Sequence, residues 1–351
     1  MITAILALIP AIALLLASRT EAAPPPSEEV EMCLGCHGDR GLTMKLPSGE
    51  VRALFVDQQA FTRSVHGDKL GCVECHGGMA EVPHPAKPFK TLRAMTLAYY
   101  EQCKRCHFAN YTKSLDSVHY ARLGAGDPRA PVCVDCHTAH AIMRPDVPRS
   151  RISKMCSRCH QEIFAAYARS VHGRALLEDE NADVPVCTDC HRSHNIGDPR
   201  LPGFLLTTPE LCGKCHTNER IMKKYGLSTR VLATYLADFH GMTASLRRAG
   251  GTTASGPTAV CTDCHGIHDI TKVRAPGSTV MQTNLVKACQ RCHPQATENF
   301  PAAWLSHYEP SWRHTPIVYA VTLFYRIFIP FVIGGLVLQI LLHLWRVVVN
   351  R

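Results

Sequence analysis

Nine times along this chain, two cysteines separated by two residues are followed directly by a histidine, and the nine motifs use all eighteen cysteines. Thiols and an imidazole at this spacing attach haem c, because the thiols bond to the porphyrin vinyl groups and the histidine binds the iron. The cysteines are Cys33, Cys36, Cys72, Cys75, Cys103, Cys106, Cys133, Cys136, Cys156, Cys159, Cys187, Cys190, Cys212, Cys215, Cys261, Cys264, Cys289 and Cys292. The histidines that follow them, the expected proximal iron ligands, are His37, His76, His107, His137, His160, His191, His216, His265 and His293.

Other uses of paired cysteines fit the pattern less well. A zinc ribbon takes two Cys-x-x-Cys units per metal and does not need a histidine after each. Redox-active Cys-x-x-Cys motifs have no such need either, and a disulfide framework requires no fixed two-residue spacing. Histidine makes up only 20 of 351 residues, so nine coincidences by chance are excluded. The sequence therefore predicts nine covalently bound haem c groups.

So many haems determine the fold class. One haem for roughly every 31 residues leaves the porphyrins themselves to form the core, around which the polypeptide wraps. Long apolar runs are few between the motifs, and no alternating run predicts an extended sheet. We expect a mainly α and irregular fold with a haem-packed core, little sheet and one C-terminal transmembrane helix. Short helices are predicted near 162–171 and 230–239, a loop at 249–259 and an insertion at 38–60.

The formal charge of +9 could indicate an acidic partner or nucleic acid. Nine haems would add eighteen propionates and nine ferric charges, which brings the oxidised protein close to neutrality. The Lys and Arg residues are then better used to neutralise propionates, and we expect no nucleic-acid partner.

Both ends of the chain carry apolar segments. Residues 2–17 are apolar and precede a stretch that resembles a signal-peptide cleavage site, so residues 1–23 are predicted to be a signal peptide. An uncleaved anchor is the alternative, because no Lys or Arg precedes the apolar run. Nineteen residues between Arg326 and Arg346 are long enough to span a bilayer, and a transmembrane helix is predicted over residues 316–346. The positive-inside rule then places residues 347–351 in the cytoplasm and the haem domain, residues 24–310, in the periplasm.

The motifs repeat in pairs. In the even-numbered motifs the residue before the second cysteine is acidic. In the odd-numbered motifs from the third onward, the residue at this position is basic. The acids are Glu74, Asp135, Asp189 and Asp263, and the bases are Arg105, Arg158, Lys214 and Arg291. We infer duplicated two-haem units at about residues 30–100, 101–153, 154–208 and 209–284, with a half unit at 285–310.

The remaining histidines follow the same period and supply one candidate distal ligand for each haem. One group follows the odd motifs, mostly as Ser-Val-His, and the other follows the even motifs. The odd-motif group is His66, His119, His172, His240 and His307, and the even-motif group is His84, His140, His194 and His268. Two histidines near the tail, His314 and His343, are left over as possible contacts of a membrane haem or a quinone.

Three of these histidines stand three residues after the motif histidine. On a helical turn, residues at i and i+3 lie on one face, with Cβ atoms about 5–6 Å apart. They cannot grip opposite faces of one haem, so His140, His194 and His268 are expected to serve a neighbouring haem.

The doubled motifs over about residues 30–310 resemble those of the multihaem cytochromes c, including the cytochrome c3-like and NapC/NrfH-like proteins. With its C-terminal span, the chain is similar to the multihaem c subunits of quinone-linked bc-type complexes. This resemblance implies an electron carrier of anaerobic respiration, anchored in the bacterial inner membrane. Its expected partners are a membrane cytochrome b or quinone-interacting subunit and periplasmic or extracellular redox proteins. No catalytic residue is predicted, and the alternative is a multihaem reductase of a small nitrogen or sulfur oxyanion.

The motif count makes a direct prediction for the purified protein. Its intact mass should equal that of the polypeptide plus nine haem groups, and its haems should be almost entirely low-spin, because each has two histidines available. A mass with fewer haems would contradict the count, and a large high-spin fraction would contradict the ligation.

Overall fold

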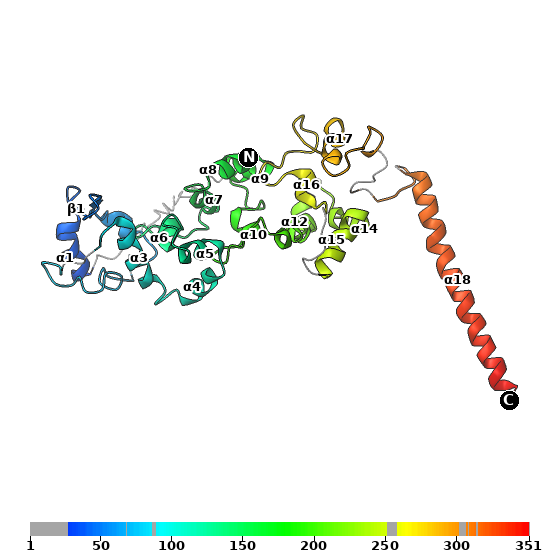
Figure 1. Ribbon diagram of the computed structural model, residues 1–351, viewed down its shortest axis with the longest axis horizontal. Helices are drawn as coiled ribbons and strands as arrows, with labels where there is room; N and C mark the ends of the chain where they lie inside the picture. Colours follow the sequence, from blue (N-terminus) through cyan, green and yellow to red (C-terminus); the bar gives the residue numbers. More distant parts are fainter. Residues whose placement is uncertain are drawn as a thin grey trace, which may run out of the picture. The chain divides into compact units, whose positions relative to one another are not determined.

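The protein is described by a computed structural model that covers residues 27–67, 69–85, 89–250, 258–301, 307, 309–313 and 315–350. The predicted signal peptide, most of the loop at 249–259 and His314 lie outside these residues. The part of the chain that the structure describes is mainly helical, with a single two-stranded sheet (Figure 1). The predicted fold class, mainly α with little sheet and one long C-terminal helix, is confirmed.

The chain forms two compact bodies, each described here by itself. The N-terminal body comprises residues 27–109 and 128–144, and the C-terminal body comprises residues 110–127 and 145–350. The N-terminal body contains α1 (Glu28–His37), β1 (Thr43–Lys45), β2 (Val51–Ala53), α2 (Gln58–Thr62), α3 (Leu92–Cys103) and α6 (Cys133–His137). From Phe108 the remaining elements are α4 (Phe108–Leu115), α5 (Val118–Gly124), α7 (Ser150–Cys156), α8 (Gln161–Arg169), α9 (Val171–Leu177), α10 (Cys187–His191), α11 (Pro202–Leu205), α12 (Thr208–His216), α13 (Glu219–Met222), η1 (Lys223–Tyr225), α14 (Val231–Ala237), α15 (Phe239–Ala249), α16 (Cys261–His265), α17 (Gln282–Gln290) and α18 (Pro316–Val349).

The small sheet lies inside the insertion predicted at 38–60. Strands β1 and β2 pair antiparallel, with Met44 opposite Arg52. Gly49 in the connecting turn has φ +88°, a conformation that glycine adopts without steric cost. Three residues per strand are too few for an alternating pattern, which explains why the sequence did not predict them.

A helical corner recurs at the Ser-x-His segments. Helix α8 ends and α9 begins at Ser170, whose Oγ accepts a hydrogen bond from the Gly173 amide at 3.0 Å. Ser117 caps α5 through Tyr120, and Asp238 caps α15 through Gly241, in the same way. An oxygen-bearing side chain at the N-cap satisfies a backbone N–H that has no helical partner. The cap therefore fixes the start of each helix whose second residue is a candidate distal histidine.

In α9 and α15 the glycine after that histidine is required by close packing. A Cβ built at Gly173 would lie 1.9 Å from the Tyr167 carbonyl oxygen, and one at Gly241 would lie 2.0 Å from the Tyr235 carbonyl oxygen. The preceding helix thus ends against the first turn of the next, and no side chain fits between them.

Apolar packing between the motifs is limited to small clusters. Tyr167, Leu176 and Val186 are buried together, and Tyr235, Ala244 and Val260 form the corresponding cluster further along. The two tyrosine hydroxyls donate to equivalent carbonyls, those of Pro185 at 2.6 Å and Ala259 at 2.9 Å. Clusters of this size agree with a fold whose core is supplied by porphyrins.

Helix α18 is long and apolar enough to cross a membrane, by its length and composition. It runs for 34 residues from Pro316 to Val349, further than the predicted 346, and its side chains are exposed (Figure 1). Arg326 and Arg346 lie at the two ends of its most apolar part. The helical turns between these arginines span about 30 Å, close to the thickness of a bilayer core.

The helical corner can be tested at its glycine. Gly173→Ala should lower the free energy of unfolding by about 1–3 kcal/mol, because the new methyl group overlaps a backbone carbonyl that cannot rotate away. Gly197→Ala is the matched control, since nothing lies within 4 Å of a Cβ at that position. Urea denaturation of both full-length variants, followed by circular dichroism, makes the comparison; equal stability of the two would contradict the packing argument.

Candidate haem-binding site

The even motifs begin short helices that cap themselves. In α6, α10 and α16 the motif runs from the first cysteine to the histidine, and its aspartate accepts a hydrogen bond from the amide three residues earlier. The pairs are Asp135 with Val132 at 2.7 Å, Asp189 with Val186 at 2.6 Å, and Asp263 with Val260 at 2.8 Å. The acid of the acid–base alternation is therefore the third residue of each helix, and its carboxylate caps the helix by accepting from the amide of the N-cap valine.

The base of the alternation also bonds to backbone. Arg105 donates to the Glu74 carbonyl at 3.5 Å, and Arg291 donates to the Asp263 carbonyl. Arg105 and Arg291 thus each reach the acidic residue of the even motif before them. The alternation links successive motifs, a structural role that the sequence alone does not reveal.

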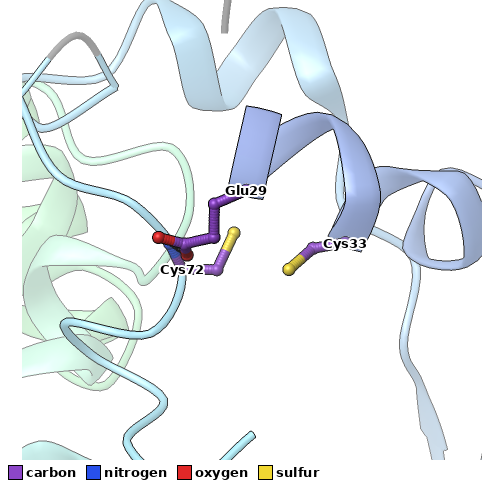
Figure 2. A group of neighbouring side chains, drawn as sticks. All are labelled: Glu29, Cys33 and Cys72. Carbon is purple, nitrogen blue, oxygen red and sulfur yellow. Dashed lines mark hydrogen bonds between the residues drawn. The ribbon is translucent and has the colours of Figure 1, made fainter. Parts of the chain in front are cut away.

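The first two-haem unit uses a different carboxylate. Its even motif carries Glu74, and the amides of Cys72 and Val73 instead donate to Glu29 of α1, at 2.7 and 2.9 Å (Figure 2). Ligand atoms of Glu29, Cys33 and Cys72 lie within 4.8 Å of one another, a spacing that a metal ion could use. Both thiols belong to haem motifs, however, so the carboxylate is better understood as the missing cap of the second motif.

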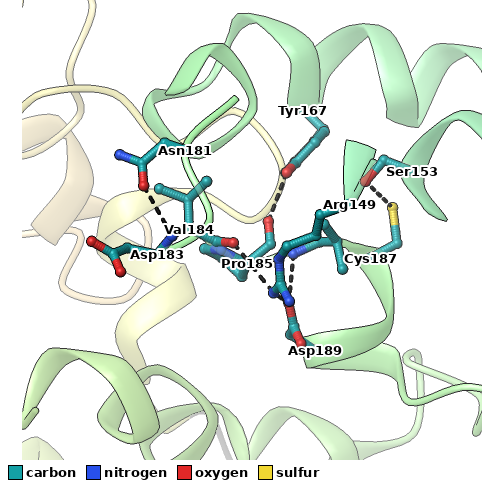
Figure 3. A network of polar contacts seen from close by, with 10 residues as sticks. Arg149, Ser153, Tyr167, Asn181, Asp183, Val184, Pro185, Cys187 and Asp189 are labelled. Atoms are coloured by element: carbon teal, nitrogen blue, oxygen red, sulfur yellow. Dashed lines mark hydrogen bonds and ion pairs between the residues drawn. The ribbon is translucent and has the colours of Figure 1, made fainter. Parts of the chain in front are cut away.

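An arginine supports the even motif in two units. Arg149 pairs with Asp189 at 2.5 Å and donates to the Val184 carbonyl at 3.4 Å (Figure 3). Arg93 pairs with Asp135 at 2.9 Å and bonds the Ala130 carbonyl in the same manner. Figure 3 also shows the Tyr167 hydroxyl on the Pro185 carbonyl; burial raises the pKa of this tyrosine to about 12. These contacts hold the segment leading into each motif.

The structure brings candidate proximal and distal histidines together in pairs. Each of eight pairs joins one motif histidine to one histidine from the distal set, with ring centroids 5.8–6.3 Å apart. The pairs are His37 with His84, His107 with His66, His76 with His140, His160 with His119, His216 with His172, His191 with His268, His293 with His240, and His265 with His307. His137 and His194 belong to different bodies, and no pairing is assigned to them.

The ring spacing fits an iron ion between the imidazoles. A histidine nitrogen lies about 2.0–2.1 Å from a metal that it binds. Two such bonds in line, together with the inner halves of two imidazole rings, place the ring centroids about 6 Å apart. Stacked imidazoles in direct contact would lie closer. The residues therefore fit bis-histidine haem, although the role of each distal histidine remains a prediction.

The pairing is interleaved along the chain. A histidine of an odd motif pairs with the distal histidine that follows the preceding odd motif, as His216 does with His172. A histidine of an even motif pairs with one from further along, as His191 does with His268. The first motif differs, because His37 pairs with His84 of its own two-haem unit. Successive units are thus interlocked by their expected ligands.

A backbone bend separates the i and i+3 histidines of the fourth, sixth and eighth motifs. Helices α6, α10 and α16 end at the motif histidine, and the next residue has positive φ: +64° at Thr138, +64° at Arg192 and +82° at Gly266. The spacing predicts the i and i+3 histidines on one helical turn. The structure shows that they do not share a turn. The bend sends His140 to His76 and His268 to His191. Thr138 and Arg192 hold a strained conformation that usually persists only where the surroundings enforce it.

Neighbouring motifs also meet through their thiols. The first thiol of each of the first four odd motifs lies beside the first thiol of the next even motif: Cys33 beside Cys72, Cys103 beside Cys133, Cys156 beside Cys187, and Cys212 beside Cys261. The second thiol of an even motif interacts with the next odd motif: Cys75 with Cys103, Cys190 with Cys212, and Cys264 with Cys289. Consecutive attachment points within each body are therefore adjacent.

Burial keeps the imidazoles in the form that binds metal. It lowers the pKa of His172 to about 4, with the nearby His216 adding to the effect, and lowers the pKa of His140 and His268. A neutral imidazole has a free nitrogen lone pair, which metal ligation requires.

The remaining candidate, His343, lies exposed on α18 three residues before Arg346.

Comparisons with known proteins agree with this site. The profile of the cytochrome c3 family matches residues 127–217. The multiheme cytochrome MtrA of Shewanella baltica (strain OS185) is 24% identical over 199 residues, which cover 54% of this chain and 53% of the relative. The chain thus spans about half the length of this curated relative. No solved structure matches significantly. Covalently bound haem c is supported, and the number nine rests on the motif count.

The capping aspartates predict a measurable loss of stability. Asp189→Ala removes the cap of α10 and the partner of Arg149, and should cost about 1–2 kcal/mol of unfolding free energy. Glu309→Ala is the control: this glutamate pairs with Arg230, both side chains are more than half exposed, and solvent screens the interaction. Denaturant titrations should give a clearly larger loss for Asp189→Ala, and the reverse order would exclude the capping role.

Proposed function

Because the chain belongs to the multihaem cytochromes c, we propose that it relays single electrons along nine haems between the membrane and periplasmic or extracellular acceptors. The membrane donor would be a quinol or a cytochrome b subunit. The haem supplies the redox chemistry, and the protein sets ligation, spacing and dielectric environment.

The observation that carries the proposal is the set of eight histidine pairs. Iron held between two imidazoles has both axial positions filled, so it exchanges electrons without binding a substrate. This arrangement favours a carrier over the alternative, a reductase of nitrogen or sulfur oxyanions, which needs an open iron position.

The adjacency of thiols supports transfer between haems. Within the N-terminal body, contacts link the first motif to the second, the second to the third and the third to the fourth. Within the C-terminal body, contacts link the motifs from Cys156 to Cys289 in order. These cysteines would hold successive porphyrins close to one another, which electron transfer between haems requires.

Helix α18 supports the proposed anchor in the bacterial inner membrane. Arg326 and Arg346 bound its apolar turns at positions suited to the two membrane surfaces. We propose that the haem domain is periplasmic and the C-terminus cytoplasmic. His343 would then lie near the inner surface, where it could contact a quinone or a partner's haem. The ninth motif immediately precedes this helix in sequence, so its haem is the proposed point of electron entry.

Quinol-dependent reduction in membranes tests the entry point. His240→Met should raise the potential of the ninth haem, because methionine ligation favours ferrous iron. Onward transfer then becomes uphill, and reduction of the other haems should slow by about tenfold or more, since 59 mV corresponds to tenfold for one electron. Stopped-flow absorbance at the haem α-band measures the rate.

The matched control is His84→Met, which makes the same change at the first haem. It should leave quinol-driven reduction of the remaining haems unchanged. Equal slowing by both variants, or no slowing by His240→Met, would refute entry at the ninth haem. Complete reduction by dithionite confirms that each variant carries its haems.

A further inference from the structure

One candidate distal histidine is held unlike the others. His84 is exposed, whereas the other eight members of the distal set are half-buried. Its ring centroid lies 6.1 Å from that of His37, a spacing like that of the other pairs. The difference therefore lies in the support of His84 and not in its position.

Six of the other eight distal histidines are supported by main-chain hydrogen bonds between distant segments. The Val65, Val118 and Val171 amides, each just before a histidine of the odd-motif group, donate to the Ile142, Ile196 and Ile270 carbonyls at 2.8 Å. Each of these carbonyls lies two residues after a histidine of the even-motif group. A single bond thus anchors His172 on one side and His268 on the other, and equivalent bonds anchor two further pairs.

The segment that carries His84 lacks such an anchor. Within the described residues 80–85, no main-chain amide or carbonyl bonds to another secondary-structure element. The polar contact of His84 among described residues is local, from its Nδ1 to the Glu81 carbonyl at 2.7 Å. Glu81 and Val82 are themselves exposed. Displacement of His84 would therefore break little besides its own bond to iron.

The opposite side of the same site is firmly built. His37 Nδ1 lies 2.9 Å from the Leu54 carbonyl, and the Val56 amide donates to the His37 carbonyl at 2.7 Å. A hydrogen bond from the far ring nitrogen fixes the orientation of a ligating imidazole and raises its basicity. One face of the first haem thus has a fixed ligand and the other a loosely held one.

We propose that the first haem exchanges His84 for a small exogenous ligand of the diatomic class, such as carbon monoxide or nitric oxide. The other haems retain their distal histidines under the same conditions. The first motif is then a ligand-binding site within an electron-carrying protein, which goes beyond the relay of electrons.

Carbon monoxide is the probe. The reduced full-length holoprotein should bind it at one haem per chain, measured from the Soret difference spectrum. The rate should level off with rising carbon monoxide concentration, because departure of His84 limits it. His84→Ala should keep the stoichiometry of one, make binding at least about tenfold faster, and make the rate linear in concentration, as expected when a barrier step is removed.

His172→Ala is the matched control, since it removes a distal histidine that main-chain bonds anchor. It should create a second carbon monoxide site while leaving the slow, saturating one unchanged. The proposal is overturned if the wild-type protein binds no carbon monoxide, or if His84→Ala leaves the binding rate unaltered. Hydrogen exchange of the intact protein gives a second check: the amides of Glu81, Val82 and His84 should exchange faster than those at 171–174, and equal protection would count against the proposal.

Discussion

This structure depends above all on the pairing of histidines drawn from different places in the sequence, at a spacing that fits an iron ion between them. The apolar clusters around Tyr167 and Tyr235 are small, so side-chain packing alone gives the described residues little core. Covalent attachment restricts the unfolded chain and helps such a fold. Ligation of one iron by both histidines of a pair would do more, because it would close loops between one two-haem unit and the next. The interleaved order of the pairs makes every described unit a supplier of ligands to its neighbours.

Simple backbone devices place those ligands. A Ser or Asp N-cap starts the helix that carries an odd-group histidine, and the following glycine lets the preceding helix approach. A capping aspartate starts the helix of an even motif, and a positive-φ residue ends it at the histidine. Each device contributes about 1–2 kcal/mol, and together they aim the paired imidazole rings toward one another.

The same devices explain how one protein could combine rigid and labile haems. Main-chain bonds from Val118 and Val171 make two distal histidines part of the scaffold. The exposed segment around His84 has no equivalent support among the described residues. An electron carrier gains from rigid sites, because unchanged ligation keeps the reorganisation on electron transfer small. A site with one loose ligand suits binding.

The sequence by itself determined the haem attachment sites, the two groups of spare histidines, the helical class and the apolar C-terminal helix. These follow from local chemistry, since a Cys-x-x-Cys-His motif or a run of apolar residues keeps its meaning in any surroundings. The helices predicted near 162–171 and 230–239 appear as α8 and α14. Each ends just before the N-cap residue of the next helix. Only the tertiary structure decided which histidine meets which, that Glu29 caps the second motif, and that a bend at Thr138 and Arg192 redirects the chain. These depend on residues 40 or more positions apart, or on strain that the whole fold sustains, and neither leaves a periodic signal in the sequence.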